Sequence, residues 1–152
     1  MDHKHYVRRA IEIARGNPDA PFGCVIADGE TGEILAEGLN DAEKSPMLHG
    51  ETAAVMNLFD KQPDVDPSTL VLYTTAEPCP MCSGAILWSG IPSVVLGTRL
   101  ETLKRLGRPL VDLPCEEVSR RASFDGFEVT YGVLEGECDA LFEEMARRAD
   151  DT

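Results

Sequence analysis

The sequence lacks the features that would place it in a membrane or outside the cell. It contains no apolar run near the roughly 20 residues that a helix needs to span a bilayer. Its first five residues, Met1–His5, lack the apolar core of a signal peptide. We therefore expect a cytoplasmic protein that makes no contact with a membrane.

Basic residues are also scarce. The 152-residue chain has 14 Lys and Arg residues against 27 Asp and Glu residues, which gives a formal net charge of −13. Binding to phosphate backbones depends on basic side chains that release counterions, so we do not expect nucleic acid as a partner. The acidic surface could equally reflect solubility or a salty cytoplasm. A local basic patch could still form from four arginines: Arg105, Arg108, Arg120 and Arg121.

Cysteine and histidine are too few and too scattered for a closed structural zinc site with four ligands. Apart from one close pair, the cysteines Cys24, Cys115 and Cys138 stand alone, and His3 and His5 lie at the N-terminus. Five cysteines form no tidy set of disulfides, and thiols that bind metal must stay reduced, which fits a cytoplasmic protein. We expect Cys24 and Cys138 to be buried as small apolar residues.

What the sequence does contain is one compact set of metal-binding residues. His49-Gly50-Glu51 is followed by the run from Pro78 to Cys82, which includes Cys79. One His nitrogen and two Cys thiolates suit zinc, and three protein ligands leave a fourth position for water. We therefore predict one catalytic Zn²⁺ per chain, bound by His49, Cys79 and Cys82.

Glu51 stands two residues after the His, where it can take and return protons beside the metal. We predict that it is the catalytic acid and base. Its alternative role is that of an acidic residue that stabilises a helix start. The Cys pair also has alternatives, a structural zinc site or a redox-active pair, but neither would require His49 or Glu51.

Hydrophobic periodicity predicts helices that alternate with strands. Both metal motifs fall at predicted helix starts, and Pro78 suits the first position of the second of these helices. Alternating helices and strands argue for an α/β protein with a mixed sheet of about five strands and helices on both faces. The chain, residues 1–152, has the size of one domain. The predicted helices are 2–15, one from 49, one through 87, 99–106 and 135–148, and the predicted strands are 22–27, 33–39, 70–74, 93–97 and 127–132.

At the two motifs the chain resembles the zinc-dependent cytidine deaminase superfamily, whose signature is His-x-Glu followed by Pro-Cys-x-x-Cys. The longer run from Thr75 to Ile86 is similar to the branch of bacterial guanine deaminases, fungal cytosine deaminases and tRNA adenosine deaminases. The resemblance begins near Pro21 and resumes from Val129 to Leu141. It implies a three-layer α/β/α cytidine-deaminase-like fold, a hydrolytic deaminase activity and, as is usual in this branch, a homodimer.

The resemblance also implies residues that bind the substrate. Asn40 would contact the base, Phe22 would form a wall of the pocket, and Trp88 would stack on a flat ring. Gly50 and Pro78, within the two motifs, are assigned to the same site. The alternatives are a turn residue for Asn40, a core residue for Phe22, and a core or dimer-interface residue for Trp88.

Two departures from the tRNA enzymes favour a small substrate. Residues 99–105 do not match their Lys-Thr-Gly-Ala-like stretch, and acidic residues surround Arg147 and Arg148 in the last helix. Guanine deaminases carry an Asp in this region, which residues 99–110 lack, while Gly90-Ile91-Pro92 is similar to the fungal cytosine deaminases. The substrate therefore stays open between related bases.

We expect a deaminase that removes the exocyclic amine of a free nucleobase or nucleoside and releases ammonia. Guanine-like purines are favoured, followed by cytosine-like pyrimidines. The alternatives are a tRNA-specific adenosine deaminase and a catalytically silent partner subunit, although the silent subunits have lost the acid that Glu51 provides here.

Overall fold

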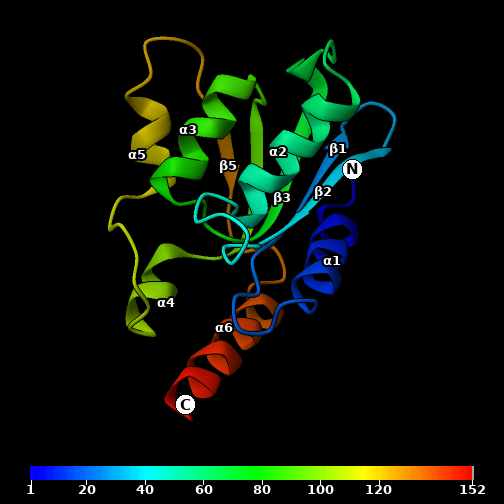
Figure 1. The fold of residues 1–152 in the computed structure, drawn as a ribbon. Helices are drawn as coiled ribbons and strands as arrows, with labels where there is room; N and C mark the ends of the chain where they lie inside the picture. Colours follow the sequence, from blue (N-terminus) through cyan, green and yellow to red (C-terminus); the bar gives the residue numbers. More distant parts are fainter. Residues whose placement is uncertain (152) are drawn as a thin grey trace.

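The computed structural model describes residues 1–151 and contains a five-stranded sheet between two layers of helices (Figure 1). The strands are β1 (Gly23–Asp28), β2 (Ile34–Leu39), β3 (Leu70–Ala76), β4 (Ser93–Thr98) and β5 (Glu128–Thr130). Their order is β2-β1-β3-β4-β5. β1 runs antiparallel to both of its neighbours, whereas β3, β4 and β5 are parallel to one another. The predicted mixed sheet is confirmed.

The helices cover both faces of the sheet, as predicted for a three-layer α/β/α fold. α1 contacts β1 and β3, and α6 contacts β4, while α2 packs on β1 and β2 from the opposite side and α3 lies between α2 and α5. No helix within residues 1–151 is long and apolar enough to cross a membrane. The helices are α1 (His3–Ala14), α2 (Gly50–Lys61), α3 (Pro80–Ser89), α4 (Leu100–Arg105), α5 (Cys115–Arg120) and α6 (Glu135–Asp150), with a 3-10 turn η1 (Pro67–Thr69).

Successive residues of the central strands point to opposite faces and so build two cores. Both cores are apolar, which is why the central strands read as continuous apolar runs rather than as alternating patterns. The core under α2 and α3 contains Cys24, Ile26, Leu72 and Val94. The core under α1 contains Val25, Ala27, Tyr73 and Val95.

The structure differs from the predicted elements in three places: two boundaries differ and one helix is additional. The second motif helix does not start at Pro78: Cys79 has extended backbone angles and caps α3, and Pro80 takes the first helical position, where a missing N–H is tolerated. Helix α5 was not predicted, because its six residues show too little hydrophobic periodicity. The last strand, predicted over 127–132, is limited to Glu128–Thr130 at the edge of the sheet.

Candidate metal centre and active site

The predicted metal ligands lie at the N-terminal ends of two neighbouring helices. His49 is the N-cap residue of α2, and its backbone N–H donates to the hydroxyl of Thr52 at 3.0 Å. Cys79 is the N-cap residue of α3, and Cys82 lies in the first turn, where its N–H donates to the Cys79 sulfur at 3.5 Å. α2 and α3 are in contact. The fold therefore brings together two motifs that are 30 residues apart.

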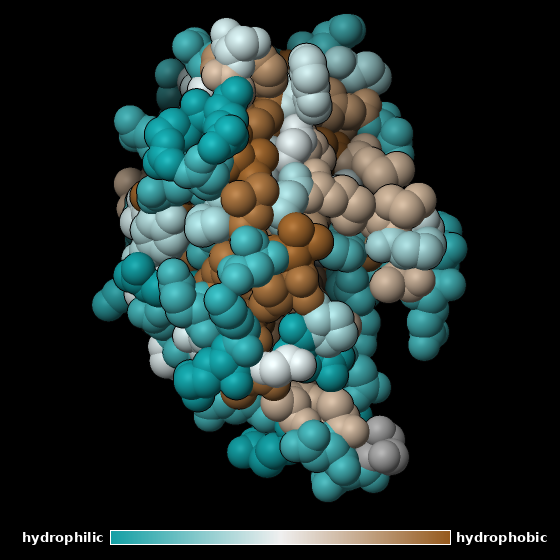
Figure 2. All heavy atoms as spheres, turned by 90° about the vertical axis from the view of Figure 1, so that its left-hand side faces the viewer, coloured by the Kyte–Doolittle hydropathy of each residue, from teal (hydrophilic) through white to brown (hydrophobic). Residues whose placement is uncertain are grey.

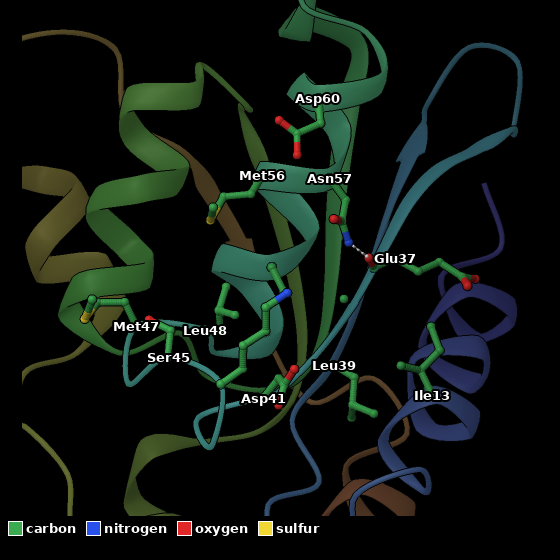
Figure 3. A pocket seen from close by; sticks show the side chains of 13 residues that line it. Ile13, Glu37, Leu39, Asp41, Ser45, Met47, Leu48, Met56, Asn57 and Asp60 are labelled. Carbon is green, nitrogen blue, oxygen red and sulfur yellow. Dashed lines mark hydrogen bonds between the residues drawn. The ribbon is translucent and has the colours of Figure 1, made fainter.

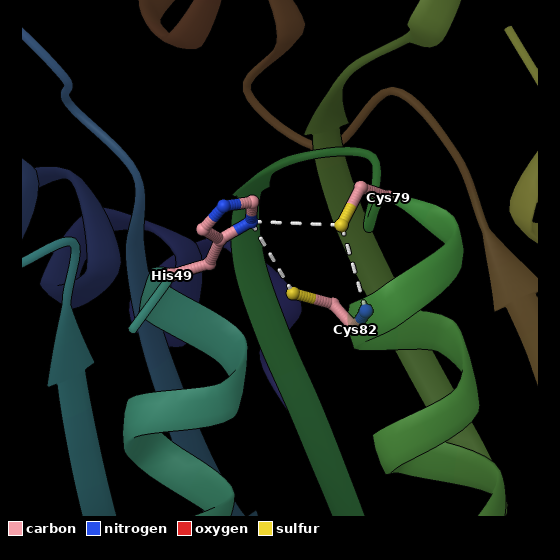
Figure 4. Close-up of side chains that lie close together, drawn as sticks. All are labelled: His49, Cys79 and Cys82. Carbon is pink, nitrogen blue, oxygen red and sulfur yellow. Dashed lines mark hydrogen bonds between the residues drawn. The ribbon is translucent and has the colours of Figure 1, made fainter. Parts of the chain in front are cut away.

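The three ligand atoms form a compact cluster (Figure 4). The His49 Nδ1 atom lies 3.5 Å from the Cys79 sulfur and 3.6 Å from the Cys82 sulfur, and all three ligand atoms are within 4.8 Å of one another. In a tetrahedral site with Zn–N of about 2.0–2.1 Å and Zn–S of about 2.3 Å, a nitrogen and a sulfur are about 3.5 Å apart. The residues therefore fit zinc in both chemistry and spacing.

Cys79 and Cys82 shift each other's pKa values in opposite directions. The thiol of Cys82 donates to Cys79, which lowers the pKa of Cys79 to about 4, with His49 adding to the effect. The same hydrogen bond raises the pKa of Cys82. Two thiolates and a neutral imidazole are the donors that a divalent cation requires, and a bound cation would favour the thiolate form of both cysteines.

Glu51 lies beside the cluster and is almost fully buried, with 2% of its surface exposed. Its pKa is raised to about 7, chiefly by burial and also by the nearby Cys79, while His49 has the opposite effect. The hydroxyl of Thr74 donates to Glu51 Oε1 at 3.3 Å and so orients the carboxyl group. A buried acid with a pKa near neutrality can both accept and return a proton, which is what the predicted role of Glu51 requires.

A cavity of about 570 Å³ lies next to the cluster, within the range of small-molecule sites. His49, Glu51 and Cys79 line it, and so do the predicted substrate residues Phe22 and Asn40. The backbone N–H of Asn40 donates to the carbonyl of Phe22 at 3.1 Å, which fixes these two residues relative to each other. Five of the predicted site residues thus meet at one cavity.

One segment, residues 100–115, supplies much of the remaining wall, and we call it the strap. It begins at the first residue of α4 and ends at the first residue of α5. Six strap residues line the cavity: Leu100, Leu103, Arg108, Pro109, Leu110 and Val111. The other lining residues are Pro46, Met47, Glu77, Pro80 and Met81.

The structure does not bring Gly50 and Pro78 to the lining of this cavity. A Cβ atom on Gly50 would lie 2.5 Å from the carbonyl oxygen of Phe22, so glycine is needed for the close approach of α2 to the start of β1. Pro78 is buried, and its carbonyl accepts a hydrogen bond from the hydroxyl of Ser83 at 3.3 Å. Both residues support the motif backbone.

Trp88 is not brought to the cavity either. Its side chain is 81% exposed near the end of α3, and its ring lies 4.9 Å from that of Phe124. This exposure also excludes the alternative that Trp88 is a core residue. Figure 2 shows a band of hydrophobic atoms on the side of the molecule that carries α3, α4 and α5 in Figure 1. Trp88 thus lies on an outer surface of the described chain.

Two charged residues of the cavity wall, Glu77 and Arg108, were not predicted as site residues. Glu77 directly precedes the Pro-Cys motif, so its position next to the ligands could have indicated it. Arg108 was considered only as part of a basic patch, and no local pattern places it at the cavity. Among the described residues that line the cavity, Arg108 supplies the one guanidinium group.

A second cavity, of about 680 Å³, is lined by residues of β2, of the loop formed by residues 41–48 and of α2 (Figure 3). Its lining includes Glu37, Asp41 and Asp60, and it shares Met47 with the first cavity. The amide of Asn57 donates to the backbone carbonyl of Glu37 at 2.8 Å at its edge. None of the three predicted metal ligands lines this cavity, so we place the active site in the smaller one.

The layered fold and the His/Cys/Cys cluster define the class of zinc-dependent deaminases. Residues 1–98 match the family model of the cytidine and deoxycytidylate deaminase zinc-binding region, and the chain belongs to this family. A probable cytosine deaminase of Schizosaccharomyces pombe is 38% identical over 112 residues, which cover 72% of this chain and 68% of that protein.

Two guanine deaminases are also similar to the chain. The enzyme of Bacillus subtilis is 37% identical over 95 residues, which cover 59% of this chain and 60% of that protein. The solved structure of the enzyme from Nitrosomonas europaea has a TM-score of 0.80 at 27% identity and covers 95% of this chain and 84% of that one. tRNA-specific adenosine deaminases are among the further matches. The family resemblance, the fold class, the deaminase class and the zinc cofactor predicted from the sequence are confirmed.

Proposed function

We propose that the chain is a zinc-dependent hydrolase that exchanges the exocyclic amine of a free base or nucleoside for oxygen and releases ammonia, with guanine-like purines favoured over cytosine-like pyrimidines. One observation carries this proposal. The ligand atoms of His49, Cys79 and Cys82 form one cluster, and two of these ligands, His49 and Cys79, line a cavity of small-molecule size together with the buried Glu51. A metal cluster and an adjacent proton carrier are the two components that hydrolytic deamination needs.

Glu51 has the central role in this mechanism. Zinc, when bound, supplies a Lewis acid that lowers the pKa of water at the site. The Glu51 carboxylate takes a proton from the attacking water, and the hydroxyl of Thr74 holds Oε1 in place. The same carboxyl returns this proton to a ring nitrogen and then transfers the second proton of that water, from the hydroxyl added to the ring carbon, to the departing amine, so that base and water become a carbonyl compound and ammonia. Burial of Glu51 keeps these transfers away from bulk water.

The cavity lining supports a flat base that carries hydrogen-bond acceptors. Phe22 and the strap residues Leu103 and Leu110 offer apolar surface, and the amide of Asn40 can both donate and accept hydrogen bonds. Arg108 adds a guanidinium, whose favoured partner among the bases is the O6 and N7 edge of guanine. In adenine and cytosine the amine that stands in the place of O6 is the group to be removed and would face the metal cluster, so neither base would present an O6 and N7 edge to Arg108.

The proposal is tested by ammonia release from zinc-loaded protein with guanine, adenine, cytosine and cytidine. We expect turnover of at least one base, with guanine fastest, and turnover at least about a hundredfold lower with the Glu51→Gln variant. The Glu101→Gln variant is a matched control, because Glu101 is exposed and does not line the cavity. Absence of turnover of every compound by the wild-type protein would contradict the proposal.

The charges on the last helix weigh against a tRNA substrate. Arg147 forms an ion pair with Glu144, and Arg148 forms one with Asp19, with 2.8 Å between Arg148 Nε and Asp19 Oδ1. Paired arginines in a chain of net charge −13 give little attraction for a phosphate backbone. Two of the four arginines of the possible basic patch are also paired with one glutamate: Arg120, the last residue of α5, and Arg121, which follows it, both pair with Glu117. The tRNA alternative predicts inosine in purified tRNA after incubation.

We also propose that two copies associate through the outer face of α3, which we define by Met81, Trp88 and Phe124. All three side chains are exposed, and none of the ten residues of α3 is charged. An uncharged face is the part of an acidic chain on which a second copy meets least repulsion. Met81 also lines the cavity, so that this interface would reach the edge of the active site.

Sedimentation of the wild-type protein tests the homodimer. We expect the wild type to be a dimer. We expect the Trp88→Ser variant to dissociate into monomers at protein concentrations at which the wild type is still a dimer. Met56→Ser is the control, because Met56 is also exposed, at 57%, but lies on α2 in the lining of the second cavity. A wild-type monomer at high concentration would contradict this part of the proposal.

All five cysteines are free, which supports a reducing compartment such as the cytoplasm.

A further inference from the structure

Glu77 is a buried carboxylate next to the metal ligands that the deamination mechanism does not use. It follows β3 and directly precedes Pro78 and Cys79, and only 7% of its surface is exposed. Its Oε1 atom accepts a hydrogen bond from the backbone N–H of Leu100 at 3.1 Å, and its Oε2 atom accepts one from Cys115 at 3.0 Å. Both oxygens are therefore engaged by the main chain.

The two donors are the first residues of two short helices, α4 and α5. N–H groups in the first turn of a helix have no partner within that helix, so a buried helix start needs an acceptor from elsewhere. A single carboxylate supplies it for both helices. Leu100 and Cys115 are also the first and last residues of the strap. Glu77 thus joins both ends of the strap to the residue before the metal-binding motif.

Between these ends the strap has few other restraints. Residues 106–114 form no helix or strand, and the ion pair between Lys104 and Asp112 is exposed to solvent. Leu103 and Leu110 pack on the cluster around Phe142. The middle of the strap, which has no regular secondary structure, carries Arg108 and three other residues of the cavity lining. The position of that wall relative to the metal ligands therefore depends on where its ends are held.

We propose that Glu77 is a positioning residue that holds the strap over the metal cluster and thereby sets the affinity for the substrate. It acts through the strap and not through the reacting atoms. Because its backbone also continues into the ligand loop, it keeps the distance between the wall and the cluster fixed. The test of this inference by enzyme kinetics rests on the proposed function. Its test by hydrogen exchange of the strap does not.

A carboxylate is suited to this role because it has two acceptor oxygens. A glutamine at the same place would keep one acceptor and turn an NH₂ group toward the other backbone N–H. The Glu77→Gln variant would therefore release one end of the strap with almost no change in side-chain volume. The shorter Glu77→Asp variant keeps both oxygens, and we expect its effects to lie between those of Gln and the wild type.

The structural experiment is amide hydrogen exchange of the zinc-loaded proteins. We expect exchange across residues 100–115 to rise at least about tenfold in Glu77→Gln, because the bond to a charged acceptor is lost. Exchange of β3 and the zinc content should stay unchanged. Glu101→Gln is the matched control, since it removes the same charge from the first turn of α4 without touching either bond. Unchanged exchange of the strap in Glu77→Gln would overturn the proposal.

The kinetic experiment separates positioning from support of the metal ligands. With guanine or the best base of the panel, we expect KM to rise roughly ten- to hundredfold in Glu77→Gln while kcat changes by less than about threefold. A fall in kcat together with loss of zinc would instead assign Glu77 to the ligand loop and overturn the proposal. If Glu77→Gln does not fold, the same split in Glu77→Asp supports the proposal, and an Asp variant with wild-type KM and exchange overturns it. Wild-type protein without turnover would reject the proposed function while leaving the exchange result decisive for the strap.

Discussion

The two walls of the cavity are built in different ways. The metal-binding wall consists of the first turns of α2 and α3, where Glu51 and Cys82 are almost fully buried. The opposite wall is the strap, where two helices of six residues flank a stretch with no regular structure. Val111 of the strap is 63% exposed. The comparison indicates that the proposed chemistry rests on rigid elements, whereas the choice of substrate rests on a segment held mainly at its ends.

The largest expected effect comes from breaking the metal-binding wall. We expect Cys79→Ala to lose zinc and to reduce turnover more than about a thousandfold, because two remaining protein ligands do not hold zinc firmly. Metal analysis and ammonia release measure both effects. Cys138→Ala is the control, since Cys138 is a free, fully buried cysteine in the core under α1 and does not belong to the metal cluster. Full zinc and activity in Cys79→Ala would show that the cluster is not the metal site.

A smaller but still large effect is expected when the metal-binding wall keeps its metal and loses its proton carrier. We expect Glu51→Gln to retain zinc and to lower kcat by about a hundred- to ten-thousandfold, the usual contribution of general acid-base catalysis. In this variant the zinc content should therefore equal that of the wild type while kcat falls. Equal losses of both would mean that Glu51 helps to hold the metal.

On the strap, the expected effect is on selectivity. We expect Arg108→Met to lower kcat/KM for guanine roughly ten- to hundredfold and to leave adenine and cytosine within a few-fold of the wild type. The measurement is a comparison of the three bases with each variant. Arg105→Met is the control, since Arg105 belongs to the same segment but does not line the cavity. A uniform loss for all bases would argue that Arg108 supports the fold of the strap and does not recognise the substrate.

The smallest effect is expected within the strap itself. Lys104 Nζ lies 2.7 Å from Asp112 Oδ2, but both side chains are more than half exposed. Exposed ion pairs contribute little, so we expect Asp112→Asn to change KM by less than about twofold. A larger change, measured in the same assay, would mean that this pair and not Glu77 determines the position of the strap.

Local sequence patterns were sufficient for the metal-binding wall. His49, Glu51, Cys79 and Cys82 lie in short motifs at helix starts, and short motifs keep their spacing whatever the rest of the chain does. The long helices and the central strands were also predicted to within a few residues, because each buries a regular apolar pattern. Helix α5 was missed, since six residues are too few to show such a pattern.

The rest of the site depends on contacts between residues far apart in the sequence. Glu77 binds Leu100 and Cys115, which are 23 and 38 residues away. No local pattern reports such pairs. Trp88 illustrates the converse: it follows Cys82 by six residues on the same helix, yet its side chain is exposed on the outer surface. Proximity in sequence to a ligand does not decide which face of a helix a side chain occupies.

The packing of Phe22 against Phe142 has a consequence for the order in which the cavity is completed. Their ring centroids are 5.0 Å apart, and Met145 belongs to the same apolar cluster. A ribosome makes all three metal ligands before it makes Phe142 and Met145, and a domain generally folds as a unit. The three ligand residues therefore exist in the growing chain before the cavity can form, and removal of Phe142 and Met145 would leave Phe22 of the cavity wall without its packing partners.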